Sequence, residues 1–246
     1  PANVVITPVN VSAAGQTVVY NGATQTFDPS TGFTVTGLQN GQTPVFGTTG
    51  LASGLNIGTY SNNITGAIIT GLSTGSLSNY NITVASQGSL TITPAPLTVT
   101  GATTFLAYNG AVQNNAAPNV VGLVGVDLLS GNGVTVTGIA SGTNAGTYTD
   151  SLSVAVNGAT LLSNYTVTKT NGALTISPLA ATITGNTTIN TYTGALQTNT
   201  YSTTGILSGD TANIVITGAA TATHVSQGTV PDTFAVSGAA AGNYTF

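Results

Sequence analysis

The stretch LTITPAPLTVTGATTFLAYNG, residues 90–110, reads as two β-strands joined at a proline. LTISPLAATITGNTTINTYTG repeats this pattern at 174–194, and VVITPVNVSAAGQTVVYNG is a partial copy at 4–22. Apolar residues alternate with Thr or Ser in these stretches, which is the period of a strand with one buried face. Because proline has no N–H to give to a sheet, we expect strands to end at Pro94 and Pro178.

Four short motifs recur in the same order along the chain, roughly 85 residues apart. They are Tyr-x-Gly at 20–22, 108–110 and 192–194; a strand ending in Thr-Gly at 33–37, 134–138 and 214–218; Gly-Thr-Tyr at 58–60 and 146–148, with Gly-Thr-Val at 228–230; and Asn-Tyr at 79–80, 164–165 and 243–244. So long a period indicates tandem domains rather than a solenoid. We predict a closing strand of a preceding module, or a donor strand, at 1–8, followed by β modules at 9–94, 95–178 and 179–246.

Strand-forming residues dominate the sequence, and no stretch has the periodicity of an amphipathic helix. Val, Ile and Thr favour extended backbone, and Gly, Asn, Pro and Ser interrupt them as turns require. We therefore expect an all-β fold in which each module is an antiparallel, Ig-like sandwich of about six to eight short strands. Because few residues separate the strands on either side of each joining proline, the modules should be strung end to end as a rod or fibre.

The chain is almost uncharged, with one Lys or Arg and five Asp or Glu among 246 residues. A single cation does not neutralise a phosphate backbone, so this composition excludes nucleic-acid binding. No apolar run approaches the roughly 18 residues that a membrane-spanning helix needs. Without a metal cluster or a nucleophile beside a base, the sequence predicts no catalytic residue, no cofactor and no metal, and therefore no enzyme.

The aspartates fall at two module positions and are the candidate metal ligands. Asp28, Asp127 and Asp210 precede a strand ending in Thr-Gly, whereas Asp150 and Asp232, with Asn62 in the first module, follow Gly-Thr-Tyr or its variant. No acidic cluster with calcium-loop spacing is present. We therefore interpret these residues as turn or loop residues that bond their own backbone rather than as calcium ligands.

Three other residue types are candidates for chemistry. His224 has no partner His or Cys, which favours an exposed loop residue. Lys169 has no counterpart in the first module, which favours an exposed charge on a strand over an isopeptide cross-link to an asparagine. The recurring tyrosines could stack on sugars, but their recurrence favours core packing with a bonded hydroxyl. These tyrosines are Tyr60, Tyr80, Tyr148 and Tyr165.

The sequence ANVVITP near the start of the chain matches the closing strands of the first two modules, and the third module lacks such a strand. Two explanations stay open. The chain is either an excerpt of a longer array or a subunit whose Val4, Val5 and Ile6 insert beside Tyr244 and Phe246 of another copy. In both cases the expected partners are neighbouring modules or copies of the chain, arranged head to tail.

Together, YNG, VTVTG, NAGTY, SNYTV and GSLTITPAPL resemble the MBG (mostly-beta, glycine-rich) and YDG-type repeats of very large bacterial surface proteins, including haemagglutinin-like adhesins. The resemblance covers nearly the whole chain and is best over 97–180. It implies a non-enzymatic stalk or filament segment at the bacterial cell surface, serving adhesion or biofilm, with no ligand residue to transfer. The alternatives are a self-polymerising fibre subunit joined by strand exchange, or a β module that binds host or surface glycans or ice.

Overall fold

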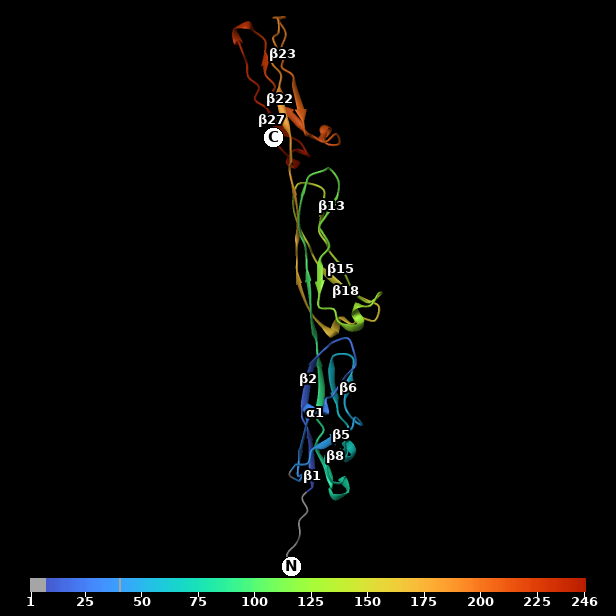
Figure 1. Ribbon diagram of the computed structural model, residues 1–246. Coiled ribbons are helices and arrows are strands. Elements are labelled where there is room, and N and C mark those ends of the chain that lie inside the picture. The colour runs from blue at the N-terminus through green and yellow to red at the C-terminus, as the bar shows by residue number, and fades with distance from the viewer. Residues whose placement is uncertain (1–7, 40) are drawn as a thin grey trace, which may run out of the picture. The chain divides into compact units, whose positions relative to one another are not determined.

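The computed structural model describes residues 8–39 and 41–246 (Figure 1). Strands predominate and the helices are single turns, so the predicted all-β class is confirmed. These turns are α1 (Pro29–Gly32) and the 3-10 helices η1 (Gly66–Ile68), η2 (Leu77–Asn79), η3 (Gly125–Leu128), η4 (Leu162–Asn164), η5 (Thr211–Asn213), η6 (Val225–Gln227) and η7 (Ala241–Asn243). No helix in the described part of the chain has the length and apolar character needed to cross a membrane.

The first copy of the repeated sequence, 9–94, forms two three-stranded sheets and two strand pairs. Its strands are β1 (Val9–Ala13), β2 (Gly15–Val19), β3 (Gln25–Thr26), β4 (Phe33–Thr36), β5 (Pro44–Phe46), β6 (Ser53–Gly54), β7 (Gly58–Ser61), β8 (Ile69–Leu72), β9 (Ile82–Ser86) and β10 (Ser89–Thr93). The sheets have the orders β4-β1-β9 and β2-β10-β7, and the pairs are β3–β6 and β5–β8. Val9, Val11 and Ala13 are buried and alternate with half-buried residues, so β1 turns one face to the core.

The second copy, 95–178, has the same strand order. Its strands are β11 (Ala95–Thr100), β12 (Thr103–Ala107), β13 (Gln113–Asn114), β14 (Asn119–Val121), β15 (Gly133–Thr137), β16 (Ser141–Gly142), β17 (Gly146–Thr149), β18 (Ser153–Asn157), β19 (Tyr165–Thr170) and β20 (Ala173–Ser177). The sheets are β14-β11-β19 and β12-β20-β17, and the pairs are β13–β16 and β15–β18. The strand ends predicted at Pro94 and Pro178 are confirmed, because β10 and β20 each stop one residue earlier.

Three of the three-stranded sheets, those centred on β1, β10 and β20, are mixed rather than antiparallel. β1 pairs antiparallel with β4 and parallel with β9, and β10 pairs parallel with β2 and antiparallel with β7. In the second copy β20 again pairs parallel with β12 and antiparallel with β17. The predicted purely antiparallel arrangement is therefore wrong. Alternation of period two fixes the face that a side chain takes, but it does not fix the direction of the neighbouring strand.

The third copy, 179–246, forms strand pairs only. Its strands are β21 (Leu179–Ala180), β22 (Thr182–Gly185), β23 (Gln197–Thr198), β24 (Tyr201–Thr204), β25 (Val215–Thr217), β26 (Thr221–Ala222), β27 (Ala235–Ser237) and β28 (Tyr244–Thr245). They pair as β21–β28, β22–β24, β23–β26 and β25–β27. The segments 186–191 and 228–231, which correspond in sequence order to β12 and β17, are not strands. Within the described residues the third copy thus has no counterpart of the sheet β12-β20-β17.

The described residues fall into two compact units. Unit 1 consists of the described residues within Pro1–Val99, Val120–Thr135 and Val154–Thr168. Unit 2 consists of Thr100–Asn119, Val136–Ser153 and Lys169–Phe246. Each unit has its own buried cluster, and neither cluster stops at a joining proline. In unit 1, Ile92 before Pro94 packs in one cluster with Leu97 after it, and in unit 2, Ile176 and Ala181 do the same across Pro178. The compact units therefore combine residues of successive copies, and the predicted module boundaries stay predictions.

Candidate functional site

Two buried tyrosines and one carboxylate form a hydrogen-bonded cluster in unit 1. Asp127 Oδ2 accepts from the hydroxyls of Tyr20, at 2.9 Å, and Tyr165, at 2.6 Å. The two rings meet edge to face with centroids 5.5 Å apart, and the Tyr165 hydroxyl accepts from the Val124 N–H at 3.2 Å. Tyr20 belongs to the first copy, whereas Asp127 and Tyr165 belong to the second. The cluster therefore joins residues of successive copies.

The same arrangement recurs in unit 2, one copy further along the chain. Asp210 Oδ2 accepts from the hydroxyls of Tyr108, at 2.8 Å, and Tyr244, at 2.7 Å. The rings again meet edge to face, with centroids 5.6 Å apart, and the Leu207 N–H donates to the Tyr244 hydroxyl at 3.0 Å. In both units, one aspartate thus accepts from two tyrosines. One tyrosine comes from the Tyr-x-Gly motif of one copy, and the other comes from the Asn-Tyr motif of the following copy. We call these two groups of three residues the tyrosine–aspartate clusters.

The asparagine of each Asn-Tyr motif adds a second connection to the preceding copy. In unit 1, buried Asn164 accepts from the Ile57 N–H at 3.1 Å, and its Nδ2 donates to Asn56 Oδ1 at 2.9 Å. In unit 2, buried Asn243 forms the equivalent bonds. It accepts from the Ala145 N–H at 2.7 Å, and its Nδ2 donates to Asn144 Oδ1 at 3.1 Å. Buried amides are stable only when bonded, so these pairs fix the register of the two copies.

The glycine of the Tyr-x-Gly motif allows the close approach in unit 1. Gly22 has a φ of 75°, and a Cβ there would overlap the backbone of Val124 and Gly125. Asn21 Oδ1 accepts from the Ala23 N–H at 2.9 Å and holds the turn. Sequence reasoning missed this contact between copies. The available signal was the recurrence of Tyr-x-Gly and Asn-Tyr together, in residues that carry no obvious chemistry.

Asp28 does not share the structural position of Asp127 and Asp210, contrary to the prediction. It is exposed and caps α1, where its Oδ1 accepts from the Ser30 N–H at 2.9 Å. The counterpart in the first copy is Gln42, whose Oε1 accepts from the hydroxyl of Tyr80. The prediction of a turn residue bonding its own backbone is confirmed for Asp28, and it is wrong for Asp127 and Asp210.

The register of the first copy explains this error. FTVTG at 33–37 contains β4, which pairs with β1 in the first copy. The strand at the same place in the second copy is β14, which pairs with β11. The glycines that follow these strands, Gly37 and Gly122, each approach the carbonyl oxygen of a proline. FTVTG therefore corresponds to the end of β14 rather than to VTVTG at 134–138. The number of residues from Gly37 to Gln42 equals the number from Gly122 to Asp127, so Gln42 occupies the position of Asp127.

The second set of aspartates binds backbone and amide groups of other strands. Asp150 accepts from the N–H groups of Ala140 at 2.8 Å and Gly172 at 3.0 Å, and from Asn115 Nδ2 at 3.0 Å. Burial raises the pKa of Asp150, but these hydrogen bonds outweigh burial and lower it below 3.8. Asp232 accepts from the corresponding Ala220 N–H, at 2.6 Å, and Asn199 Nδ2, at 2.9 Å. The prediction of loop residues bonding their own backbone is wrong here as well.

Burial and carboxylate bonding raise the pKa of the clustered tyrosines. Burial first, and then the hydrogen bond to Asp210, raise the pKa of Tyr108 from 10.0 to about 12. Burial and the hydrogen bond to Asp127 likewise raise the pKa of Tyr20 and Tyr165 above 10.0. Both causes disfavour the phenolate, because it would be a second anion beside a carboxylate away from water.

The free energy of unfolding should therefore fall as the pH rises from 10 toward about 12. Because the folded chain holds phenol protons that the unfolded chain releases, this stability is fully present below pH 10 and is lost as the pH passes the raised values. Denaturant titrations at a series of pH values, with tyrosinate absorbance on the same samples, measure both quantities. Tyr108→Phe should flatten the dependence, and unchanged stability across this range would contradict the assignment.

His224 and Lys169 lie outside any cluster of titratable groups. His224 is exposed, and its backbone N–H donates to Gln227 Oε1 at 2.8 Å. Lys169 is exposed on β19, and its Nζ donates to the Leu152 carbonyl oxygen at 2.9 Å. The predictions of an exposed loop histidine and an exposed strand lysine are confirmed. Among residues 8–39 and 41–246, no three His, Cys, Asp or Glu side chains gather where they could hold a metal ion.

The four module tyrosines pack against the protein itself. A Cβ at Gly54 would overlap the ring of Tyr60, and a Cβ at Gly142 would overlap the ring of Tyr148. Each of these hydroxyls donates to a carbonyl oxygen four residues earlier, at 2.9 Å. The hydroxyls of the Asn-Tyr tyrosines also donate, that of Tyr80 to Gln42 and that of Tyr165 to Asp127. The predicted bonded hydroxyls are confirmed for all four. The predicted core packing is confirmed for Tyr165 alone, because the other three rings are half-buried.

Threonines form a short row on the outer face of one sheet. Thr17, Thr91 and Thr59 lie in register across β2, β10 and β7, and the hydroxyls of Thr59 and Thr91 are 3.2 Å apart. In the second copy Phe105 takes the place of Thr17 and is 74% exposed. A regular threonine face, as the ice-binding alternative needs, is therefore interrupted.

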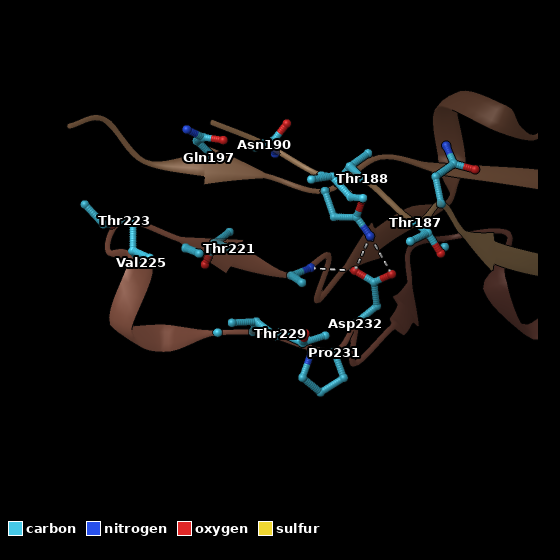
Figure 2. Close-up of a pocket in the computed structure, with 18 of the residues that line it drawn as sticks. Thr187, Thr188, Asn190, Gln197, Thr221, Thr223, Val225, Thr229, Pro231 and Asp232 are labelled. Atoms are coloured by element: carbon cyan, nitrogen blue, oxygen red, sulfur yellow. Dashed lines mark hydrogen bonds between the residues drawn. The ribbon is translucent and has the colours of Figure 1, made fainter. Parts of the chain in front are cut away.

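A cavity of about 660 Å³ lies within the third copy (Figure 2). Its lining comes mainly from 185–192, 220–225 and 228–232. Figure 2 shows Thr188 and Asn190 on one side, Thr229 and Pro231 on the other, and the bonded carboxylate of Asp232 between them. The lining contains one acidic residue and many hydroxyls, so the cavity suits an uncharged ligand rather than a cation.

The predicted strand-donation contact stays a prediction. Val4, Val5 and Ile6 lie outside the described residues. Tyr244 and Phe246 do not line the cavity. The Tyr244 hydroxyl is bonded to Asp210, and the ring of Phe246 packs on that of Tyr244 with centroids 6.0 Å apart.

No family model, curated protein or solved structure matches this chain. The resemblance to MBG-type repeats therefore stays a prediction.

Proposed function

We propose that the chain is a non-enzymatic structural segment, a stalk or filament piece, of an extracellular bacterial adhesin or fibre. In the finer form of this proposal, Ig-like β modules follow one another end to end as a rod. Its function is mechanical: it holds another part of the protein away from the cell surface, or it builds a filament.

The recurring tyrosine–aspartate cluster is the observation that carries this proposal. In unit 1 and again in unit 2, a tyrosine of one copy is bonded to an aspartate of the next, more than 100 residues away in sequence. An active-site carboxylate needs to reach a substrate. Asp127 is instead 2% exposed and accepts from two protein hydroxyls, which suits a residue that fixes the register of neighbouring copies.

Composition and resemblance support the extracellular placement. One Lys and no Arg leave almost no site for trypsin-like proteases, which favours survival outside the cell. Hydroxyls and amides keep the surface polar in place of charges. MBG-type repeats, which the motifs resemble, belong to bacterial surface and secreted proteins.

Small-angle X-ray scattering of the chain in solution tests the stalk role. We expect the profile of an extended rod, with a maximum dimension that hardly changes between low and high salt because so few charges are present. The double variant Asp127→Ala, Asp210→Ala should bend and lose the rod signature, whereas Asp28→Ala should keep it. A compact profile for the unmodified chain would contradict the proposal. Antibody labelling of intact cells tests the placement at the surface.

A further inference from the structure

Asparagine followed by glycine is the dipeptide in which a side-chain amide is lost most readily. Because glycine has no Cβ, its backbone nitrogen can reach the Cγ of the preceding asparagine. The N–Cγ bond forms and the Cγ–Nδ2 bond breaks, so that ammonia leaves with the glycine N–H proton and a succinimide ring remains. Water then opens the ring at one of its two carbonyls, which gives aspartate or isoaspartate. Five such pairs lie wholly within the described residues, at 21–22, 109–110, 132–133, 157–158 and 171–172.

In two of these pairs the attacking nitrogen is already bonded. The Gly133 N–H donates to Thr160 Oγ1 at 2.8 Å, and the Gly172 N–H donates to Asp150 Oδ2 at 3.0 Å. Both acceptors belong to buried residues. The nitrogen turns toward the asparagine side chain only after this bond breaks, and breaking a buried bond costs free energy. The asparagines of these two pairs are therefore protected.

In the pair at 157–158 the side-chain amide is held instead. Asn157 Nδ2 donates to Thr135 Oγ1 at 2.9 Å, and that hydroxyl donates to Asn157 Oδ1 at 3.1 Å. Asn157 is the last residue of β18, and Thr135 lies on β15, the strand paired with it. The Cγ of Asn157 therefore turns toward the Gly158 nitrogen only when both of these bonds between the strands are lost.

The remaining two asparagines, Asn21 and Asn109, belong to Tyr-Asn-Gly motifs and are exposed. In each, the side-chain Oδ1 accepts from the N–H two residues later, at 2.9 Å. Negative charge develops on this oxygen when the glycine nitrogen attacks, so the bonded N–H stabilises the tetrahedral intermediate as an oxyanion-hole donor does. Among residues 8–39 and 41–246, no group accepts from the N–H of Gly22 or Gly110. In both motifs the amide is thus activated and the attacking nitrogen is free.

The two motifs differ in the space around their glycine. Gly22 is buried, and an atom at its Cβ position would lie 2.6 Å from the Val124 carbonyl oxygen. Gly110 is exposed, and the same position meets only the Leu207 side chain, at 3.3 Å. Closing the succinimide ring rotates the peptide group between asparagine and glycine. The turn that contains Gly110 has room for this rotation, whereas the turn that contains Gly22 is packed against backbone of the next copy.

We propose that Asn109 is a site of spontaneous deamidation, and that isoaspartate at this position loosens the tyrosine–aspartate cluster of unit 2. Isoaspartate routes the main chain through the former side chain, which adds one methylene between Tyr108 and Gly110. The ring of Tyr108 is 4% exposed and its hydroxyl donates to Asp210 at 2.8 Å, so the longer main chain displaces a tightly packed residue. The third copy has Thr193 at this position, which has no amide to lose. This modification goes beyond the stalk function and does not rest on it.

Ageing the purified chain in mildly alkaline buffer, followed by digestion with pepsin and mass spectrometry, tests the site. Deamidation replaces an NH2 group by OH, and the mass gain identifies the residue; labelling by an isoaspartyl methyltransferase identifies isoaspartate. We expect Asn109 to react first, at least about tenfold faster than Asn132 and Asn171. In denaturant the five pairs should react at similar rates, because all are Asn-Gly. Equal rates in the folded chain, or Asn132 ahead of Asn109, would overturn the proposal.

Thr160→Val is the variant that separates the effect of structure from that of sequence. It keeps the shape of the side chain and removes the acceptor of the Gly133 N–H. Because one hydrogen bond contributes about 1 kcal/mol, Asn132 should deamidate about fivefold faster than in the unmodified chain. The rate at Asn109 should stay the same. An unchanged rate at Asn132 would contradict the protection argument on which the choice of Asn109 depends.

Hydrogen exchange on the aged chain tests the effect on the cluster. The Leu207 N–H, which donates to the hydroxyl of Tyr244 in the same cluster, should exchange faster as isoaspartate accumulates. The Val124 N–H, which donates to the equivalent hydroxyl in unit 1, should exchange as before. Asn109→Gln removes the reactive pair, and ageing should then leave exchange at Leu207 unchanged. If chains with isoaspartate at position 109 exchanged the Leu207 N–H at the original rate, the cluster would not depend on this turn.

Discussion

Asp127→Ala should lower the free energy of unfolding by about 4 kcal/mol. The carboxylate accepts from two buried hydroxyls, those of Tyr20 and Tyr165. Alanine leaves both donors without an acceptor, and each unsatisfied buried donor costs about 1–3 kcal/mol. It also removes one of the connections between the first and second copies, so the loss should exceed that of an ordinary surface substitution.

Denaturant unfolding followed by tyrosine fluorescence measures this loss. Asp28→Ala is the control, because it removes an exposed helix cap and should cost about 1 kcal/mol. Asp127→Asn should cost less than Asp127→Ala, since an amide oxygen can still accept, as Gln42 accepts from Tyr80 in the first copy. The local effect should also be visible as faster hydrogen exchange of the Val124 N–H. Equal losses for the Asp127 and Asp28 alanine variants would refute the role of the cluster.

Gly138→Ala should cost about 3 kcal/mol or more. Gly138 has a φ of 79°, which disfavours any residue with a Cβ, and the added methyl would overlap the carbonyl oxygen of Ser151. The Ser151 N–H donates to the Gly138 carbonyl at 2.7 Å, so the two backbones separate only by breaking that bond. Gly50 and Gly218 face the carbonyls of Asn63 and Thr233 in the same way.

Gly131→Ala is the matched control for this prediction. Gly131 has a φ of 88°, but nothing lies within 4 Å of the position that its Cβ would take. Its substitution should cost only the backbone strain, about 1 kcal/mol. Thermal unfolding of the two variants, measured side by side, separates the cost of backbone strain from the cost of steric overlap by the added methyl group. If Gly131→Ala cost as much as Gly138→Ala, the contact with Ser151 would have no importance.

Much of the local structure could be predicted from residue types alone. Period-two alternation identified the strands around Pro94 and Pro178, and the lack of an N–H on proline explained where they end. The recurrence of tyrosines predicted packed rings with bonded hydroxyls, which Tyr60 and Tyr148 show. These features depend on neighbours in sequence, so a single chain contains the information for them.

The direction of neighbouring strands and the contacts between copies could not be predicted in the same way. The parallel pairing of β10 with β2 depends on strand direction, which alternation does not encode. FTVTG at 33–37 resembles VTVTG at 134–138 more closely than it resembles its true counterpart at the end of β14, so sequence similarity predicts the wrong register for the first copy. That register pairs Asp28 with Asp127, although the true counterpart of Asp127 is Gln42, an uncharged residue that no search for acidic positions detects.

The parallel pairing of the second strand with the last strand, in each of the first two copies, has a mechanical consequence. β2 and β10 are in register from Gly15 opposite Ser89 to Val19 opposite Thr93, and β12 and β20 are paired in the same sense. Tension along the chain enters a copy ahead of β2 and leaves it after β10, so it drags the two strands past each other. All bridging hydrogen bonds are then loaded in shear at once, instead of unzipping singly, and the copy should hold until it ruptures in one step.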